Sequence, residues 1–147
     1  TRATITASDL VPDALVVAAR NVERHGVSAR VRLVVADLFD GVGGPFDLIA
    51  VNPPYVPLTD APGLEPEVRE FEPATALFAG PDGLQVIRRL VLEAPASLAR
   101  HGLLMFEFGA GQDRAVTALI DASPDLELLE LRNDLQDIPR MAVVRRA

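Results

Sequence analysis

The sequence of 147 residues contains no cysteine and no lysine. The lack of cysteine excludes a disulfide framework, a thiolate metal site and catalysis by a cysteine nucleophile. All 14 basic residues are therefore arginine, and the 21 acidic residues outnumber them, which gives a formal net charge of -7. No basic stripe stands out along the chain, and this disfavours duplex nucleic acid as a tightly bound partner.

The sequence also shows no leader with a charged start and an apolar centre, and no apolar run long enough to cross a bilayer. We therefore expect a protein of the cytoplasm, and we expect it to be a monomer. Hydrophobic residues make up 49% of the chain, which is enough to bury a sizeable core in one domain over residues 1–147.

Short β-prone runs alternate with amphipathic segments along the chain. Strands are expected over residues 3–7, 31–36, 46–51, 103–108, 126–131 and 141–145. Helices are expected from Pro12 to about Gly26, from Pro81 to about Pro95, and from about Asp113 to Asp121. This alternation predicts an α/β fold with a doubly wound, mostly parallel sheet and a C-terminal antiparallel hairpin.

The segment over residues 56–81 carries several prolines and acids and has no clean period. We expect a loop with one helical turn over residues 66–70, and loops of this length are usually lids or binding loops. Its acidic side chains are most simply a solvated face, and the alternative is a docking surface for an arginine-rich or amide-donating partner. These residues are Glu65, Glu67, Glu70 and Glu72.

The tetrapeptide Asn52-Pro53-Pro54-Tyr55 directly follows the apolar run over residues 46–51. That run has one polar residue, which is typical of a strand buried on both faces of a parallel sheet. Ligands of open α/β sheets bind at the carboxyl ends of the strands, so an amide and an aromatic ring on a rigid turn there form a candidate site. The two prolines fix φ and leave carbonyl oxygens held still. The simpler alternative is a proline-rich turn that only closes the strand.

Carboxylates end three of the expected strands. Asp9 ends the first, where dinucleotide-binding folds place an acid that accepts from ribose hydroxyls, although an aspartate that caps the next helix gives the same pattern. Asp37-Leu38 ends the second, where a carboxylate and a backbone N–H suit adenine, although such an aspartate commonly starts a turn. Glu107, near the end of the strand over residues 103–108, is most simply a solvated carboxylate, and the alternative places it at the rim of the site.

In combination, these motifs resemble the PrmC/HemK family of protein-(glutamine-N5) methyltransferases, which modify peptide chain release factors. The likeness covers nearly the whole chain. It rests on residues 7–15, 36–39, 52–55, 72–73, 80–84 and 106–112. The C-terminal region fits less well, because the family usually has an Asp-Arg pair where this chain has Pro139-Arg140.

The resemblance implies a Rossmann-like domain that uses S-adenosylmethionine, with Asp9, Asp37, Leu38 and Asn52 as cofactor-binding residues. It implies that residues 52–55 form the catalytic turn and that a release factor is the protein substrate. It implies no metal. The family's Gly-rich cofactor loop and small helical N-terminal domain lie upstream of a residue equivalent to Asp9. We therefore expect a partial methyltransferase domain that lacks the first central strand of its sheet.

The chemistry of an amide explains the tetrapeptide. A glutamine nitrogen is a poor nucleophile because its lone pair is delocalised into the carbonyl, so a site must orient it. If the side-chain oxygen of Asn52 and the backbone carbonyl of Pro53 each accept one N–H, the remaining face of the nitrogen points toward the methyl donor. Tyr55 would pack its ring against the amide plane. This needs no general base, and the only histidines, His25 and His101, are expected in turns.

Two other functions fit the same residues. A nucleic-acid adenine or guanine N-methyltransferase can use the same tetrapeptide to hold a base amine, but it should show a basic groove. A non-catalytic truncated remnant or interaction domain would show little affinity for the cofactor.

Overall fold

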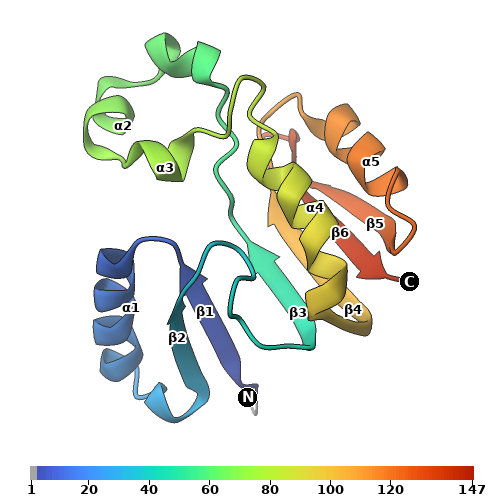
Figure 1. The fold of residues 1–147 in the computed structure, drawn as a ribbon. Coiled ribbons are helices and arrows are strands. Elements are labelled where there is room, and N and C mark those ends of the chain that lie inside the picture. The colour runs from blue at the N-terminus through green and yellow to red at the C-terminus, as the bar shows by residue number, and fades with distance from the viewer. Residues whose placement is uncertain (1–2) are drawn as a thin grey trace. The chain divides into compact units, whose positions relative to one another are not determined.

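The computed structural model describes residues 3–147. The chain divides into two compact units, the first ending at Gly44 and the second running from Pro45 to Ala147. The described strands form two separate sheets, with two strands in the first unit and four in the second (Figure 1).

The first unit is a strand, a helix and a strand. β1 (Ile5–Asp9) pairs in parallel with β2 (Val31–Val35), and α1 (Pro12–Arg24) contacts both strands. Pro12 opens the helix and Gly26 follows its end with φ +63°, as expected for a helix terminus. A short 3₁₀ turn, η1 (Ser28–Arg30), leads into β2. Between residues 3 and 44, only Ala36 is buried, so this unit has little core of its own.

The second unit contains a mixed sheet with the order β3-β4-β6-β5. β3 (Phe46–Val51) runs parallel to β4 (Leu98–Glu107), and β4 pairs in the antiparallel sense with β6 (Pro139–Arg146). β6 pairs in the same sense with β5 (Leu126–Asn133), which confirms the expected C-terminal antiparallel hairpin. The alternation of helices and strands, with parallel pairs first and a hairpin last, agrees with the predicted α/β class.

The core of the second unit lies between this sheet and two helices. α4 (Gln85–Ser97) and α5 (Asp113–Asp121) contact each other, and Figure 1 shows both on the same side of the sheet. Successive strand residues point to opposite faces, and along β4 the residues Leu104 and Phe106 are almost completely buried. The largest fully buried side chains are Phe106, Phe108, Ile87, Leu90, Leu98, Leu104, Ile120, Val116 and Val144.

β3 corrects one expectation. We predicted a strand buried on both faces, but Ile49 is buried whereas Leu48 is 53% exposed. The reason is that α4 and α5 lie on the same side of the sheet (Figure 1), so the helices of this unit cover one face of β3. β3 also lies at one end of the strand order of this sheet, so one row of its backbone groups has no partner within the sheet.

Several other details differ from the prediction, among them the end of α4, the start of β4 and the segment after Tyr55. α4 continues through Pro95 to Ser97, because a proline in the last turn removes only one helical hydrogen bond. β4 begins at Leu98 and not at residue 103, because Phe46 pairs with Leu98 across an irregularity in the register. The segment after Tyr55 has three short helical pieces where one turn was expected. They are η2 (Leu58–Gly63), α2 (Pro66–Phe71) and α3 (Ala74–Leu77).

Within residues 3–147, no helix combines the length and the apolar character that crossing a membrane requires.

The burial pattern of α4 gives a matched pair of variants. Leu90 is 0% exposed and Leu92, two residues later on the same helix, is 80% exposed. We expect Leu90→Ala to lower the free energy of unfolding by about 2–5 kcal/mol, because it leaves a cavity in the core. Leu92→Ala should change it by less than about 0.5 kcal/mol. Urea denaturation followed by circular dichroism measures both, and similar values for the two variants would contradict this core.

Candidate active site

The tetrapeptide Asn52-Pro53-Pro54-Tyr55 lies where we predicted it, at the carboxyl end of β3. The last ladder pair before it is Val51 with Phe106, so the turn begins at a fixed point of the sheet. Asn52 is exposed, Pro53 is buried and Tyr55 is half-buried. The backbone carbonyls of this turn are held by two rigid residues, and the amide of Asn52 is accessible from solvent.

The phenol of Tyr55 lies between two charged side chains. Its hydroxyl donates a hydrogen bond to Oε1 of Glu107 at 2.8 Å and accepts one from Nη2 of Arg140 at 3.0 Å. The same Nη2 lies 3.2 Å from Glu107 Oε1, so the three groups form a closed triangle. The guanidinium of Arg140 is 5.3 Å from the centroid of the Tyr55 ring, within the range of a cation–π contact.

These contacts shift the protonation equilibrium of the phenol. Burial raises the pKa of Tyr55 above its ordinary value, and the hydrogen bond to Glu107 and the charge of that carboxylate raise the pKa further. The positive charge of Arg140 and its hydrogen bond lower the pKa of Tyr55 and offset part of the rise. The phenol is consequently neutral at physiological pH, where it acts as a donor to Glu107.

Glu107 is not the merely solvated carboxylate that we expected. Its side chain is 38% exposed and that of Arg140 is 26% exposed, and both contact Tyr55. Arg140 was missed as a site residue, and its only sequence signal was the Pro139-Arg140 pair in a region where the family resemblance is weak. A residue near the end of the chain becomes part of this cluster because β6 pairs with β4 and begins beside its carboxyl end.

The side-chain amide of Gln112 joins three backbone segments. Its Nε2 donates to the carbonyl oxygen of Tyr55 at 3.0 Å and to that of Asp82 at 3.4 Å. Its Oε1 accepts from the backbone N–H of Gly109 at 2.7 Å. The amide therefore uses its donor and acceptor ends together to hold the tetrapeptide against the loop that follows β4.

Gly83 makes this junction possible. Its φ is +72°, a left-handed conformation that favours glycine. A β-carbon at this position would lie 2.2 Å from the carbonyl oxygen of Tyr55 and 2.7 Å from Nε2 of Gln112. No side chain fits in that space, so the glycine is required by both the backbone conformation and the contact.

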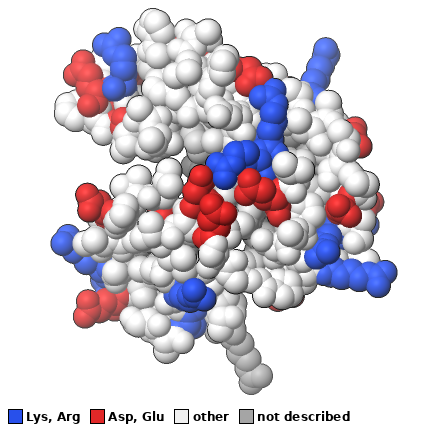
Figure 2. Space-filling view, in the orientation of Figure 1, with Lys and Arg blue, Asp and Glu red and all other residues white. Residues whose placement is uncertain are grey.

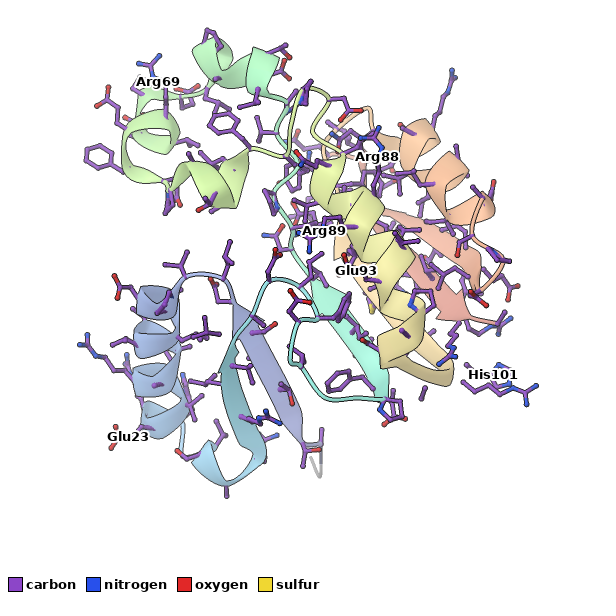
Figure 3. The ribbon with its side chains drawn as sticks, in the orientation of Figure 1. Glu23, Arg69, Arg88, Arg89, Glu93 and His101 are labelled. Carbon is purple, nitrogen blue, oxygen red and sulfur yellow. The ribbon has the colours of Figure 1, made fainter. Side chains whose placement is uncertain are left out.

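Asp82 joins the same loop to α4. One carboxylate oxygen accepts from the backbone N–H of Leu84 at 3.1 Å, and the two oxygens bind Arg88 at 3.1 and 2.5 Å. Arg88 lies on the first turn of α4, which Figure 3 shows near the upper end of that helix. The hydrogen bonds from Arg88 and Leu84 lower the pKa of Asp82 to about 2.

The chain after the tetrapeptide makes an excursion that closes on itself. The backbone N–H of Val56 donates to Leu77 at 2.9 Å, and the carbonyl of Val56 accepts from Ala79 at 3.0 Å. The N–H of Leu58 donates to Gly80 at 3.0 Å. These bonds fix both ends of the segment that carries η2, α2 and α3, so its base is firm although Phe71 on α2 is 81% exposed.

The expected cofactor-binding residues of the first unit lie at the carboxyl ends of its two strands. Asp9 is the ladder partner of Val35, and its carbonyl accepts from the N–H of Ala36 at 3.0 Å, so Asp9 and Asp37 end neighbouring parallel strands. One carboxylate oxygen of Asp9 accepts from the N–H of Val11 at 2.8 Å, which supports the turn into α1. Leu38 has φ +51°, an uncommon conformation for a residue with a side chain.

The groups present at these strand ends fit S-adenosylmethionine in their chemistry. The sugar and the adenine of the cofactor offer hydroxyl and amine donors, and Asp9 and Asp37 are acceptors at adjoining strand ends. The bond from Val11 leaves the Asp9 carboxylate able to accept further donors. Asp9 can therefore accept from the backbone before α1 and bind a ribose hydroxyl at the same time.

Several glutamine methyltransferases are similar to this chain in sequence. The chain is 44% identical over 138 residues to a release factor glutamine methyltransferase from Rhodospirillum rubrum, covering 94% of this chain and 42% of that protein. It is 42% identical over 139 residues to one from Chlorobaculum tepidum, covering 90% of this chain and 47% of that protein. A ribosomal protein uL3 glutamine methyltransferase from Francisella tularensis is 42% identical over 125 residues, covering 84% of this chain and 38% of that protein.

Over most of its length the chain is similar to release factor glutamine methyltransferases, the family also called PrmC/HemK. It spans about half the length, or less, of the family members it matches. No protein-family model matches the sequence.

Solved structures support the Rossmann-like methyltransferase fold. TrmN from Thermus thermophilus matches 98% of this chain and 36% of its own chain with a TM-score of 0.68 at 18% identity. An O-methyltransferase from Bacillus cereus in complex with SAH matches 98% of this chain and 63% of its own with a TM-score of 0.62 at 10% identity. The predicted fold class is thereby confirmed.

Gly83 gives a test of the junction at the tetrapeptide. Gly111 also has a positive φ, +80°, but a β-carbon there meets nothing within 4 Å, so it isolates backbone strain from steric overlap. We expect Gly111→Ala to lower the free energy of unfolding by about 1–2 kcal/mol. Gly83→Ala should lower it further, because it also displaces Tyr55. Equal losses in urea denaturation would show that the close contact is absent.

Asp82 gives a test by pH. Because its folded pKa lies below the ordinary 3.8, its carboxylate stabilises the folded state above that pH, and the contribution is lost as the pH falls toward about 2. We expect Arg88→Gln to raise the pKa of Asp82 toward 3.8, measured by carboxyl carbon NMR. Arg132→Gln, which removes an exposed ion pair with Glu130, is the control and should leave that pKa unchanged.

Proposed function

We propose that this chain is part of an S-adenosylmethionine-dependent methyltransferase that methylates the side-chain amide nitrogen, N5, of a glutamine in a peptide chain release factor. The observation that carries the proposal is the clamped turn at the end of β3. Asn52 is exposed between a ladder pair at Val51 and a fully bonded Tyr55. The names of the relatives from Rhodospirillum rubrum and Chlorobaculum tepidum support the choice of substrate.

Residues 1–147 then form part of one methyltransferase domain. We assign Asp9 to the ribose hydroxyls, and Asp37 with the backbone at Leu38 to the adenine. Asn52 would contact the cofactor from the turn as well as the substrate. When bound, S-adenosylmethionine supplies an electrophilic methyl group on a positively charged sulfur. We place the protein in the cytoplasm, as a monomer, where release factors act.

The residues of the turn would orient the substrate. The side-chain oxygen of Asn52 and the carbonyl oxygen of Pro53 accept the two N–H groups of the glutamine amide, which fixes the plane of the nitrogen. The ring of Tyr55 supports that plane from one side. A preorganised turn matters because orientation of a weak nucleophile can supply a large part of a rate enhancement. The prolines and the Gln112 clamp keep the acceptors in place before the substrate arrives.

A glutamine in a ribosomal protein is a second candidate substrate. The uL3 glutamine methyltransferase from Francisella tularensis is 42% identical to this chain over 125 residues, and a glutamine amide presents the same chemistry in either protein. A nucleic-acid base is disfavoured. On the face drawn in Figure 2, arginines and acids are interspersed and do not form a basic stripe, and the formal net charge is -7.

The cofactor assignment is tested by calorimetry on the 147-residue chain with S-adenosylmethionine and S-adenosylhomocysteine. We expect Asp9→Ala to weaken binding by about tenfold or more, because a hydrogen bond to a charged group contributes about 1.5–3 kcal/mol. Asp121→Ala, at the exposed end of α5, is the matched control and should bind like the unaltered chain. Absence of binding by the unaltered chain would support a non-catalytic remnant.

The substrate assignment is tested by methyl transfer to a release factor, with the ribosomal protein and a DNA duplex as competing substrates. We expect Asn52→Ala to reduce turnover about 100-fold, the order seen when one orienting polar group of an active site is removed. Asn21→Ala, on the exposed face of α1, is the control. Transfer by Asn52→Ala at the rate of the unaltered chain would overturn the role of the turn.

A further inference from the structure

The hydroxyl of Tyr55 is already engaged on both sides. It donates its one proton to Glu107 at 2.8 Å and accepts from Arg140 at 3.0 Å. A phenol has a single donor, so this hydroxyl cannot also donate to a substrate without breaking the bond to Glu107. What Tyr55 can offer to a bound amide is therefore its ring.

One side of that ring is also occupied. The guanidinium of Arg140 lies 5.3 Å from the ring centroid while its Nη2 bonds the hydroxyl of the same residue. The carbonyl of Tyr55 is held by Gln112 at 3.0 Å. Tyr55 is therefore held at three points: its backbone carbonyl, its hydroxyl and its ring. The residues that hold it are Glu107 on β4, Arg140 on β6 and Gln112 at the N-cap of α5.

We propose that Glu107 and Arg140 are positioning residues that hold the Tyr55 ring in one orientation, with one contact to the hydroxyl each and the guanidinium against the ring. They act on the substrate only through Tyr55. The inference rests on the proposed function for what the ring presents to a glutamine amide. The fixed orientation of the ring is a property of the chain itself.

The two charges of this cluster compensate each other. Glu107 alone would attract the phenolic proton but leave its own charge half-buried beside an aromatic ring. Arg140 neutralises that charge at 3.2 Å and adds its own bond to the hydroxyl. Removal of either residue leaves the other without its ion-pair partner, so each variant should loosen the ring by a different route.

Tyr55 reports directly on this triangle, because the chain contains one tyrosine and no tryptophan. Ultraviolet absorbance of the phenolate as the pH is raised therefore measures the pKa of Tyr55 without cofactor or substrate. Glu107 raises that pKa and Arg140 lowers it. We expect Glu107→Gln to lower the pKa of the phenol and Arg140→Gln to raise it.

Two controls separate this result from a general loss of structure. Glu127→Gln and Arg145→Gln break an exposed ion pair of 2.6 Å between β5 and β6, and they should leave the phenol titration unchanged. Circular dichroism at each pH shows whether the fold persists. An unfolded variant would titrate near the ordinary value of 10.0, so opposite shifts from Glu107→Gln and Arg140→Gln cannot arise from unfolding. Titrations that match the unaltered chain would overturn the proposal.

Turnover distinguishes positioning from a merely structural role. With a glutamine peptide, we expect Glu107→Gln and Arg140→Gln to lower kcat about tenfold or more, while KM for S-adenosylmethionine stays unchanged and Arg140→Lys recovers part of the loss. Full turnover with a displaced phenol pKa would overturn positioning. If the unaltered chain transfers no methyl group, the proposed function fails, and the titration with opposite shifts still decides whether the two residues hold the ring.

Discussion

One side-chain amide determines the geometry of the candidate site. Gln112 bonds the carbonyls of Tyr55 and Asp82 and the N–H of Gly109, and these three groups lie outside the ladders of the sheet. Half-buried backbone groups of this kind need partners, because an unsatisfied carbonyl or N–H away from water is destabilising. A hydrocarbon side chain could fill the same space, but it could not satisfy three segments together.

The position of Tyr55 follows from that constraint. Gln112 holds the backbone carbonyl of Tyr55, and Glu107 and Arg140 hold its hydroxyl. Both the backbone position and the side-chain orientation of Tyr55 are therefore restrained. Pro53 and Pro54 also restrict the backbone between Tyr55 and Asn52, because the φ angle of each proline is fixed by its ring. The turn is therefore rigid at its centre through covalent structure and at its end through hydrogen bonds, which is the preorganisation that an amide-orienting site requires.

Sequence reasoning located the elements better than it located the contacts. The limits of β3 and α5 and the start of α1 at Pro12 are as predicted, because apolar runs and a helix-opening proline are local signals. The cluster around Tyr55 was not foreseen, because its two partners are distant in the sequence. Glu107 is separated from Tyr55 by 52 positions, and Arg140 by 85 positions. The exposed face of β3 was missed for the same reason, because the covering of a strand by helices is not a local property.

The two units differ in how firmly they support their candidate site residues. The turn of residues 52–55 rises from a four-stranded sheet with a closely packed core, whereas Asp9 and Asp37 end a two-stranded pair where Ala36 is the one buried residue between residues 3 and 44. A small unit with so little buried apolar surface gains little stability from a hydrophobic core of its own. A ligand that binds these folded strand ends and not the unfolded chain must stabilise the first unit by mass action. If S-adenosylmethionine binds at Asp9 and Asp37 as proposed, its affinity and the folding of β1 and β2 are therefore thermodynamically linked.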